Sequence, residues 1–278
     1  MASFDDALQL APSLSVVTRR TGIAAYDFDF RRYLPVSSVW DFRRAGPVVL
    51  RVGPIDDYRT LTAELVEAGA RLLLSPEQHV RVSHLPAWYP LLEGLTPRSV
   101  VYETVPSSAE VGGTLGWPVF IKGSRQTNRH KASTSVARSP ADFERIRQAW
   151  RHDDILHWQQ MVCREWLRLA PVGEPVGDVV QPSMEVRTVY FRGELAAAGA
   201  YWSDHPWRPT PAQLDGALEV AKEAVRRLDV PLVAVDLAVD VEGRWWVVEC
   251  NDAQECGVAG MSPLVMWQTI QSIAAGSA

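Results

Sequence analysis

The first third of the chain alternates short apolar runs with one stretch of helical periodicity. The pattern predicts strands over 14–18, 47–52 and 71–74 and a helix over 56–68. Asp56 or Asp57 can cap the start of this helix, and Gly69 can adopt the left-handed backbone conformation that ends it. Strand, helix, glycine and strand in this order are typical of a parallel βαβ unit. We therefore expect an α/β domain over residues 1–95.

From about residue 96 the pattern changes to hairpins and well-capped helices. It predicts strands over 100–104, 119–122, 133–138, 155–162, 186–191, 195–202, 232–241 and 245–250, and helices over 106–115, from 139 onward and over 211–228. Ser139 can cap the middle helix, with Pro140 in its first turn. Residues 171–182 are rich in Pro, Gly and Val and predict an irregular insertion or a lid.

Composition and charge narrow the class of protein. Of the 278 residues, 47% are hydrophobic and 22% are charged, so the chain can bury a large core. The net charge of −5 argues against a dedicated surface for nucleic acid or anionic membranes. No apolar run approaches the ~20 residues that cross a bilayer, and the acidic start differs from a secretion signal. We expect a soluble, cytoplasmic protein.

Packing is the favoured role for the cysteines and tryptophans. Cys163, Cys250 and Cys256 are odd in number and form no CxxC pair, which argues against a disulfide framework or a zinc site and favours a reducing compartment. Among the 11 tryptophans, Trp202 and Trp207 flank polar loops and are candidates to line a substrate pocket.

Three oxygen-bearing side chains in the last predicted hairpin are candidate metal ligands. Asp236 lies inside an apolar strand, Glu249 ends the facing strand, and Asn251 follows two residues later. Side chains alternate along a strand, so Glu249 and Asn251 point to one face, which Asp236 can also reach. Such ligands suit magnesium. The alternative is that Asp236 pairs with an arginine or a backbone amide and that Asn251 forms a turn.

Three cationic side chains are candidates to bind phosphate. Lys122 ends a predicted strand, and Lys131 follows the polar loop 123–130, so the two can grip a triphosphate from both sides. The loop contains one glycine and is therefore not a Walker-type loop. Arg187 can hold a phosphoryl group or a carboxylate. The alternatives are surface lysines and a salt bridge from Arg187 to Glu185 or another acid.

These motifs together resemble the ATP-grasp superfamily. The resemblance rests on Phe120-Ile-Lys122, Trp158-Gln-Gln-Met-Val162, Glu185-x-Arg187 and Asp236…Glu249-x-Asn251, in that order. One arginine and two lysines resemble the clade of the superfamily that is defined by this set. The resemblance implies an α/β ATP-grasp fold: a Rossmann-like domain at 1–95, then an ATP-grasp domain at 96–278, whose small lobe (about 96–162) and large lobe (about 163–278) hold the nucleotide between them.

The resemblance also implies roles for individual residues. Lys122 and Lys131 would contact the phosphates of ATP, and Lys122 would also lie near adenine N7. Gln160, Met161 and Val162 would form a hinge that binds adenine through the Gln160 carbonyl and the Val162 N–H. Glu165 would bind the ribose hydroxyls. The loop after Lys122 lacks the glycines of many members, so the grip on phosphate is expected to differ in detail.

The implied catalytic centre combines a cation with a metal site. Arg187 would stabilise the transferred γ-phosphoryl group, together with Lys131. Asp236, Glu249 and Asn251 would bind one or two Mg²⁺ ions, with Glu249 between the two; Mn²⁺ is also compatible.

The resemblance implies an ATP-dependent carboxylate–amine ligase that forms an acyl-phosphate and releases ADP and phosphate. Its substrates would be a small acid and an amine, such as an amino acid or a peptide-like metabolite, and no side-chain nucleophile is needed. Arg51, Gln254 and Glu255 are candidates to bind them. The alternative functions are a small-molecule kinase and a non-catalytic nucleotide-binding module. A homodimer is also compatible with the sequence.

Overall fold

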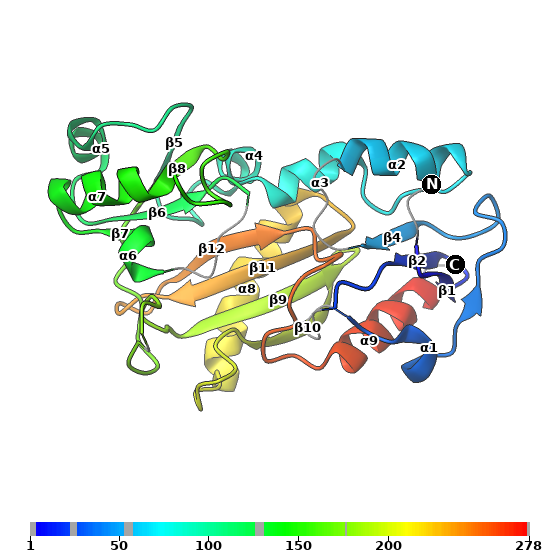
Figure 1. Ribbon diagram of the computed structural model, residues 1–278. Coiled ribbons are helices and arrows are strands. Elements are labelled where there is room, and N and C mark those ends of the chain that lie inside the picture. Colours follow the sequence, from blue (N-terminus) through cyan, green and yellow to red (C-terminus); the bar gives the residue numbers. More distant parts are fainter. Residues whose placement is uncertain (1–3, 23–26, 53–57, 126–130, 176, 277–278) are drawn as a thin grey trace.

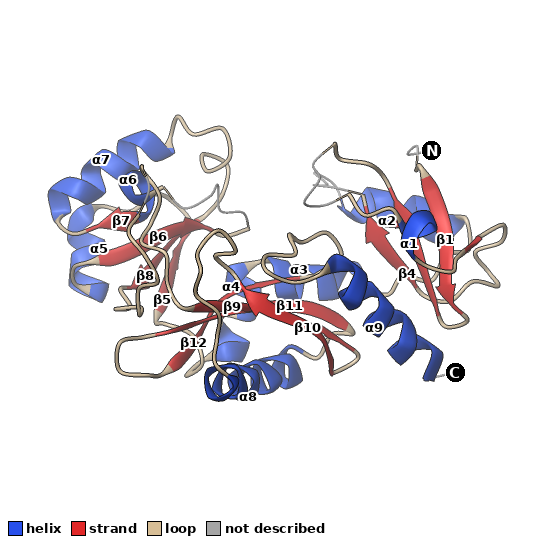
Figure 2. Ribbon diagram, turned by 90° about the horizontal axis from the view of Figure 1, so that it is seen from below, coloured by secondary structure: helices blue, strands red, loops and turns tan. Residues whose placement is uncertain are grey.

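The computed structural model describes residues 4–22, 27–52, 58–125, 131–175 and 177–276, which form three four-stranded sheets with helices around them. Figure 1 shows the three sheets in a row, with the sheet of β9 to β12 in the middle. Figure 2, from below, shows α8 against one face of this central sheet and α9 beside the sheet of β1 to β4. No helix among the described residues has the length and apolarity to cross a membrane.

The N-terminal sheet is mixed rather than fully parallel. Its strands are β1 (Asp6–Ala11), β2 (Leu14–Thr18), β3 (Ser37–Ser38) and β4 (Val48–Arg51), in the order β3-β1-β2-β4, with α1 (Phe30–Tyr33) and α2 (Tyr58–Glu67). β2 and β4 are parallel, and β1 is antiparallel to β2 and β3. The parallel pairing predicted from the sequence was instead that of 47–52 with 71–74. Gly69 has φ +92°, as the helix stop requires. The strand predicted over 71–74 is only a single bridge from Leu72 to Val48, and the caps predicted at Asp56 and Asp57 lie outside the described residues.

The second sheet has the order β5-β8-β6-β7. Its elements are β5 (Ser99–Tyr102), α5 (Ser108–Leu115), β6 (Val119–Gly123), α6 (Ala132–Ser135), β7 (Val136–Ala137), α7 (Pro140–Trp150) and β8 (Met161–Glu165). The first half of the strand predicted over 133–138 belongs to the short helix α6, and only Val136 and Ala137 form a strand, β7. The strand predicted over 155–162 is wrong for residues 155–160, because Asp153 Oδ1 accepts the backbone N–H groups of Ile155 and Leu156 and holds this stretch in turns. Its last two residues, Met161 and Val162, begin β8.

The third sheet, called here the large sheet, is antiparallel and has the order β10-β9-β11-β12. Its elements are β9 (Glu185–Phe191), β10 (Glu194–Ala200), α8 (Pro211–Leu228), β11 (Leu232–Val239) and β12 (Trp245–Asn251). Both predicted hairpins and the predicted helix are confirmed. A capping box of Thr210 and Gln213 opens α8, whose apolar face covers one side of the sheet.

The remaining helices join the sheets into shared cores. They are α3 (Pro76–Ser83), α4 (Leu85–Trp88), the 3₁₀ helix η1 (Pro90–Leu92) and α9 (Pro263–Gly276). Val82 and Trp88 pack into the core beneath the large sheet. Trp267 of α9 packs with Leu8 of the N-terminal sheet. A domain boundary at residue 95 therefore stays a proposal, because α3, α4 and α9 pack across it.

Candidate active site

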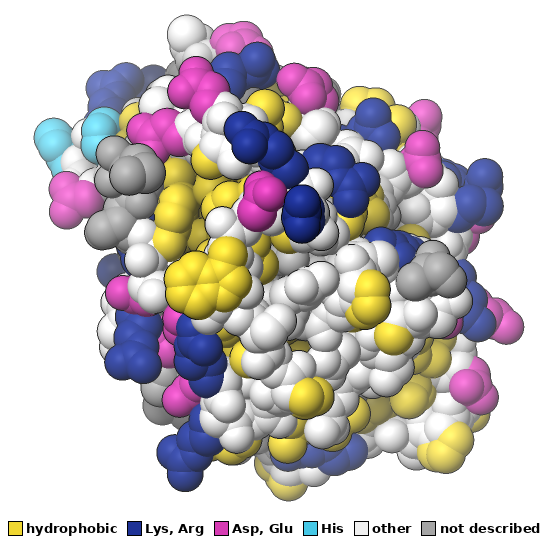
Figure 3. Space-filling view, turned by 90° about the vertical axis from the view of Figure 1, so that its right-hand side faces the viewer, with side chains coloured by type: hydrophobic (Ala, Val, Ile, Leu, Met, Phe, Trp, Pro, Cys, Tyr) yellow, Lys and Arg dark blue, Asp and Glu magenta, His cyan; other side chains and the backbone are white. Residues whose placement is uncertain are grey.

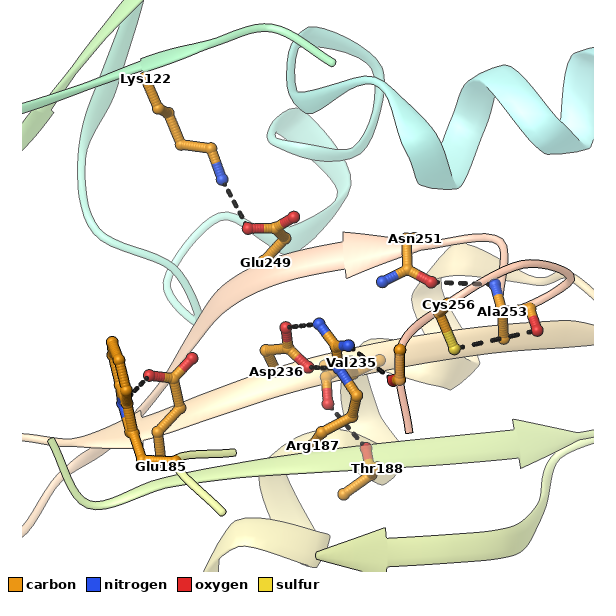
Figure 4. A network of polar contacts seen from close by, with 12 residues as sticks. Lys122, Glu185, Arg187, Thr188, Val235, Asp236, Glu249, Asn251, Ala253 and Cys256 are labelled. Atoms are coloured by element: carbon orange, nitrogen blue, oxygen red, sulfur yellow. Dashed lines mark hydrogen bonds and ion pairs between the residues drawn. The ribbon is translucent and has the colours of Figure 1, made fainter. Parts of the chain in front are cut away.

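Three charged side chains lie side by side across the large sheet. Arg187 on β9 is the register partner of Asp236 on β11, and Asp236 is the partner of Glu249 on β12. Figure 4 shows the three side chains on one face of the sheet. The hairpins therefore bring together the arginine and two of the candidate metal ligands.

Arg187 and Asp236 form a buried ion pair with two parallel hydrogen bonds. Nε donates to Oδ1 at 2.7 Å and Nη2 donates to Oδ2 at 2.6 Å. A third donor, Nη1, reaches the carbonyl of Gly257 at 2.8 Å, and the guanidinium lies 4.9 Å from the ring centroid of Tyr201. Burial alone would lower the pKa of Arg187, but Asp236 outweighs it and raises that pKa above its usual value. The salt bridge expected as the alternative is thus present, with Asp236 as its acid.

Lys122 connects the second sheet to the large sheet. Its Nζ donates to Glu249 Oε2 at 2.9 Å, and the two side chains are 6% and 27% exposed. A buried ammonium needs such a partner, because desolvating an unpaired charge costs several kcal/mol. Together with Arg187 and Asp236, the pair forms a row of alternating charges, which we call the charge row.

Asn251 lies at the end of the charge row, where β12 ends. Its Oδ1 accepts the N–H of Ala253 at 3.0 Å, which supports the left-handed backbone of Ala253 (φ +54°). The turn-forming contact considered from the sequence is therefore present. Among the described residues, no group of three His, Cys, Asp or Glu side chains is arranged to hold a metal. A cation at this face would need the Asn251 amide beside the two carboxylates.

Glu185 was missed by the sequence reasoning as a site residue. It lies two residues before Arg187 on β9, so both side chains share a face, and its Oε2 accepts Trp202 Nε1 at 3.1 Å. Burial, and next the charge of Asp236, raises the pKa of Glu185 to about 8. Trp202 therefore contacts the site, whereas Trp207 packs against the core under the large sheet.

The hinge predicted at residues 160–162 lies at the start of β8. Met161 and Val162 belong to β8, which is paired with β5 on one side and β6 on the other. The Gln160 carbonyl accepts the N–H of Ser124 at 3.1 Å, and the Gln160 side chain donates to Glu103. The structure thus uses the Gln160 carbonyl, which was assigned to adenine, for pairing with the chain after β6.

The chain leaves the second sheet after Glu165, whose side chain is exposed. The connection 166–168 then leads to the large sheet, where Leu169 bridges Asp240. Lys131 is also exposed, and its main chain bridges Val179 of the insertion 171–182. Most of the loop between Lys122 and Lys131 lies outside the described residues.

The three substrate candidates lie together at the junction with the N-terminal sheet. Arg51 Nη1 donates to the carbonyl of Gln254 at 2.8 Å, and Nη2 lies 3.6 Å from Glu255 Oε1. The Gln254 side chain accepts the N–H of Leu50 at 3.1 Å. Arg51 and Glu255 also line a cavity of about 420 Å³.

A second polar group next to these residues was also missed. His79 Nδ1 lies 2.7 Å from Asp252 Oδ2, and the His79 ring stacks on Tyr58 with centroids 3.9 Å apart. Asp252 directly follows Asn251, but His79 comes from α3, which is distant in the sequence. No local pattern marked His79, because only the packing of α3 beside β12 brings it here.

The family of this chain is shown by comparison with known protein families, and the buried cations and carboxylates between two β-sheets agree with the result. A family model for an ATP-grasp domain, the third family of the clade named for one arginine and two lysines, matches residues 114–270. The chain belongs to the ATP-grasp superfamily. The matched residues of this ATP-grasp protein include Lys122, Arg187 and the three candidate metal ligands. A search among curated proteins found no match.

Solved structures support the same ATP-grasp fold at low sequence identity. An ADP complex of a carboxyaminoimidazole ribonucleotide synthetase matches with a TM-score of 0.56 and 14% identity, over 77% of this chain and 55% of that one. A RimK domain ATP-grasp protein from Sphaerobacter thermophilus matches with 0.56 and 15%, over 82% and 80%. An L-amino acid ligase from Bacillus licheniformis matches with 0.51 and 13%, over 75% and 49%. The chain thus spans about half the length of the synthetase and the amino acid ligase.

Proposed function

We propose that this ATP-grasp protein is an ATP-dependent carboxylate–amine ligase that acts on small molecules. The charge row carries the proposal. Lys122 and Arg187 are buried cations from different sheets, and each is paired with a carboxylate that can also bind a metal. The phosphates of ATP can bind the two cations, and a divalent ion can bind the two carboxylates. These contacts would replace the two ion pairs.

The residues of the large sheet fit magnesium. Asp236 and Glu249 are register neighbours, Asn251 shares the face of Glu249, and all three offer the hard oxygen ligands that this ion prefers. When bound there, magnesium would neutralise charge on the phosphates of ATP.

The proposed reaction has two steps. A carboxylate oxygen of the acid attacks the γ-phosphorus, the bond from that phosphorus to the ADP oxygen breaks, and an acyl-phosphate forms. The amine nitrogen then attacks the acyl carbon, the carbon–oxygen bond to phosphate breaks, and the nitrogen gives up a proton as the amide forms. In the first step Arg187 would orient the transferred group and stabilise its charge. Lys131, whose side chain is exposed, would approach the phosphates from the opposite side.

We further propose that the base binds at 166–168 rather than at 160–162. The main-chain groups of Trp166 and Leu167 form no backbone hydrogen bond to any described residue, so they can pair with a base. The connection also lies between the two sheets that carry Lys122 and Arg187. Glu165, at the start of this connection, then remains the candidate for the ribose hydroxyls.

The test is a screen of ADP release with pooled acids and amines, followed by mass analysis of the product. A ligase releases ADP and phosphate only when both an acid and an amine are supplied, and its product has the mass of their amide. A phosphorylated product would instead identify a kinase. ATP binding without ADP release from any pool would identify a nucleotide-binding module and reject the proposal.

A further inference from the structure

The cavity beside Arg51 lies where the parallel strands β2 and β4 end. Thr18 is the last residue of β2 and Arg51 the last residue of β4, and both line the cavity. Ligands of open α/β sheets bind at the carboxyl ends of their strands. The volume of about 420 Å³ lies within the usual range for small-molecule sites.

The lining combines an apolar wall with charges of both signs. Phe28 and Phe30 provide the wall, and carboxylates outnumber guanidinium groups in the lining. Asp27 needs no cation to stay ionised, because it accepts the N–H and the hydroxyl of Thr21 and the N–H of Gly22. Figure 3, which faces this end of the molecule, shows acidic and basic side chains interspersed. Such a lining favours a zwitterion or a cation over an anion.

Arg51 and Glu255 form the charged inner side of the cavity. Arg51 is 5% exposed, and its Nη2 lies 3.6 Å from Glu255 Oε1, beyond the usual hydrogen-bond distance. The ammonium and the carboxylate of an α-amino acid are separated by one carbon. They can therefore pair with Glu255 and Arg51 at the same time and replace this long contact.

The cavity is close to the charge row along the chain. Arg51 donates to the Gln254 carbonyl and Arg187 donates to the Gly257 carbonyl, each at 2.8 Å. The α-carbons of Gln254 and Gly257 are at most about 11 Å apart, because consecutive α-carbons lie 3.8 Å apart. Glu255 lies between them in the sequence, so a ligand at Glu255 is near the place where Arg187 would hold the acyl-phosphate.

We propose that this cavity binds the amine substrate, and that the substrate is a free α-amino acid. This inference rests on the proposed ligase activity. The α-carboxylate binds Arg51, the α-ammonium binds Glu255, and the side chain faces Phe28 and Phe30. Amino acids with acidic side chains bind worst, because the lining is rich in carboxylates.

Thr18→Trp tests the cavity without touching the charge row. The indole would fill the space at the end of β2, where the Thr18 side chain is half-buried. The matched control is Thr114→Trp on α5, where the threonine is exposed on the second sheet's side of the molecule. Arg51→Gln, which removes the buried charge, is a second variant. Each of the twenty common amino acids is titrated into the protein with MgAMP-PNP by calorimetry, and ADP release is followed with the amino-acid pool.

The inference expects at least one amino acid to bind, with aspartate and glutamate weakest. Thr18→Trp should weaken this binding and raise the KM for the amine at least tenfold, with the KM for ATP and kcat within twofold of the wild type. Thr114→Trp should change neither. Absence of binding by all twenty amino acids, or an unchanged amine KM in Thr18→Trp, overturns the inference. The second result leaves the ligase activity standing. Amino-acid binding without ADP release rejects the ligase activity instead.

Discussion

The buried pair of Arg187 and Asp236 gives the sharpest prediction about stability. The side chains are 10% and 2% exposed, so Asp236→Leu would leave the guanidinium buried without a counter-charge. Breaking a buried pair in this way typically costs about 3–5 kcal/mol. In a chain of 278 residues, each kcal/mol lowers Tm by roughly 2 °C. We therefore expect Tm to fall by roughly 6–10 °C.

Removing both charges should be far less harmful than removing one. In Arg187→Met with Asp236→Leu, no charge is left buried, and such replacements are neutral or stabilising by about 1–4 kcal/mol. The carbonyl of Gly257 loses its donor, which costs about 1–3 kcal/mol. The two effects nearly cancel, so the Tm of the double variant should lie close to that of the wild type. The double variant should still release no ADP, because its phosphate ligand is gone.

The measurement is a double-mutant cycle of thermal and urea unfolding on the metal-free protein. Glu223→Gln is the control, because Glu223 pairs with Arg226 and Arg227 on the exposed face of α8 and such pairs contribute little. Its Tm should barely change. If the Tm of Asp236→Leu equals that of the wild type, or if the Tm of the double variant lies below those of both single variants, an uncompensated buried charge is not the source of the destabilisation.

Three further predictions concern the site. Glu249→Ala and Lys122→Ala should each abolish ADP release with an unchanged circular dichroism spectrum; normal ADP production by folded Glu249→Ala contradicts the metal role. Lys131→Ala should raise the KM for ATP severalfold, and an unchanged KM removes this lysine from the nucleotide site. Burial, followed by the charge of Asp236, raises the pKa of Glu185 from 4.5 to about 8, so between these pH values the folded protein holds a proton that the unfolded chain has lost. The free energy of unfolding should then fall by up to about 5 kcal/mol as pH rises through this window. Urea unfolding of Glu185→Gln at several pH values should lack this fall, and a fall of wild-type size in the variant would show that Glu185 is not its source.

Local patterns predicted most of the large sheet, because its signals lie within single elements. β9 and β11 are buried at nearly every position, each hairpin turns at a glycine with positive φ (Gly193 and Gly243), and α8 carries its own capping box. The strand prediction was wrong over residues 155–160, because this apolar run is held in turns by Asp153. Because β8 begins at Met161, the connection between the two sheets comes after Glu165, several residues beyond the hinge predicted at 160–162.

The sequence marked the members of the charge row, but not how they pair. Arg187, Asp236 and Glu249 were each marked by a charge within an apolar strand. The bond from Lys122 to Glu249 spans 127 residues of sequence and that from His79 to Asp252 spans 173, so neither has a local signal. The alternatives for Asp236 and Asn251 were a salt bridge and a turn, and the structure contains both contacts.

The packing of α9 on the N-terminal sheet has a consequence for folding during synthesis. Trp267 and Ile270 of α9 complete the hydrophobic core that contains Leu8 and Val16 of the first two strands. At roughly 5–20 residues per second, α9 leaves the ribosome on the order of 10–50 s after β2. During that interval the apolar face of β1 and β2 lacks the cover that α9 gives it, so this core can close only once nearly the whole chain has been made.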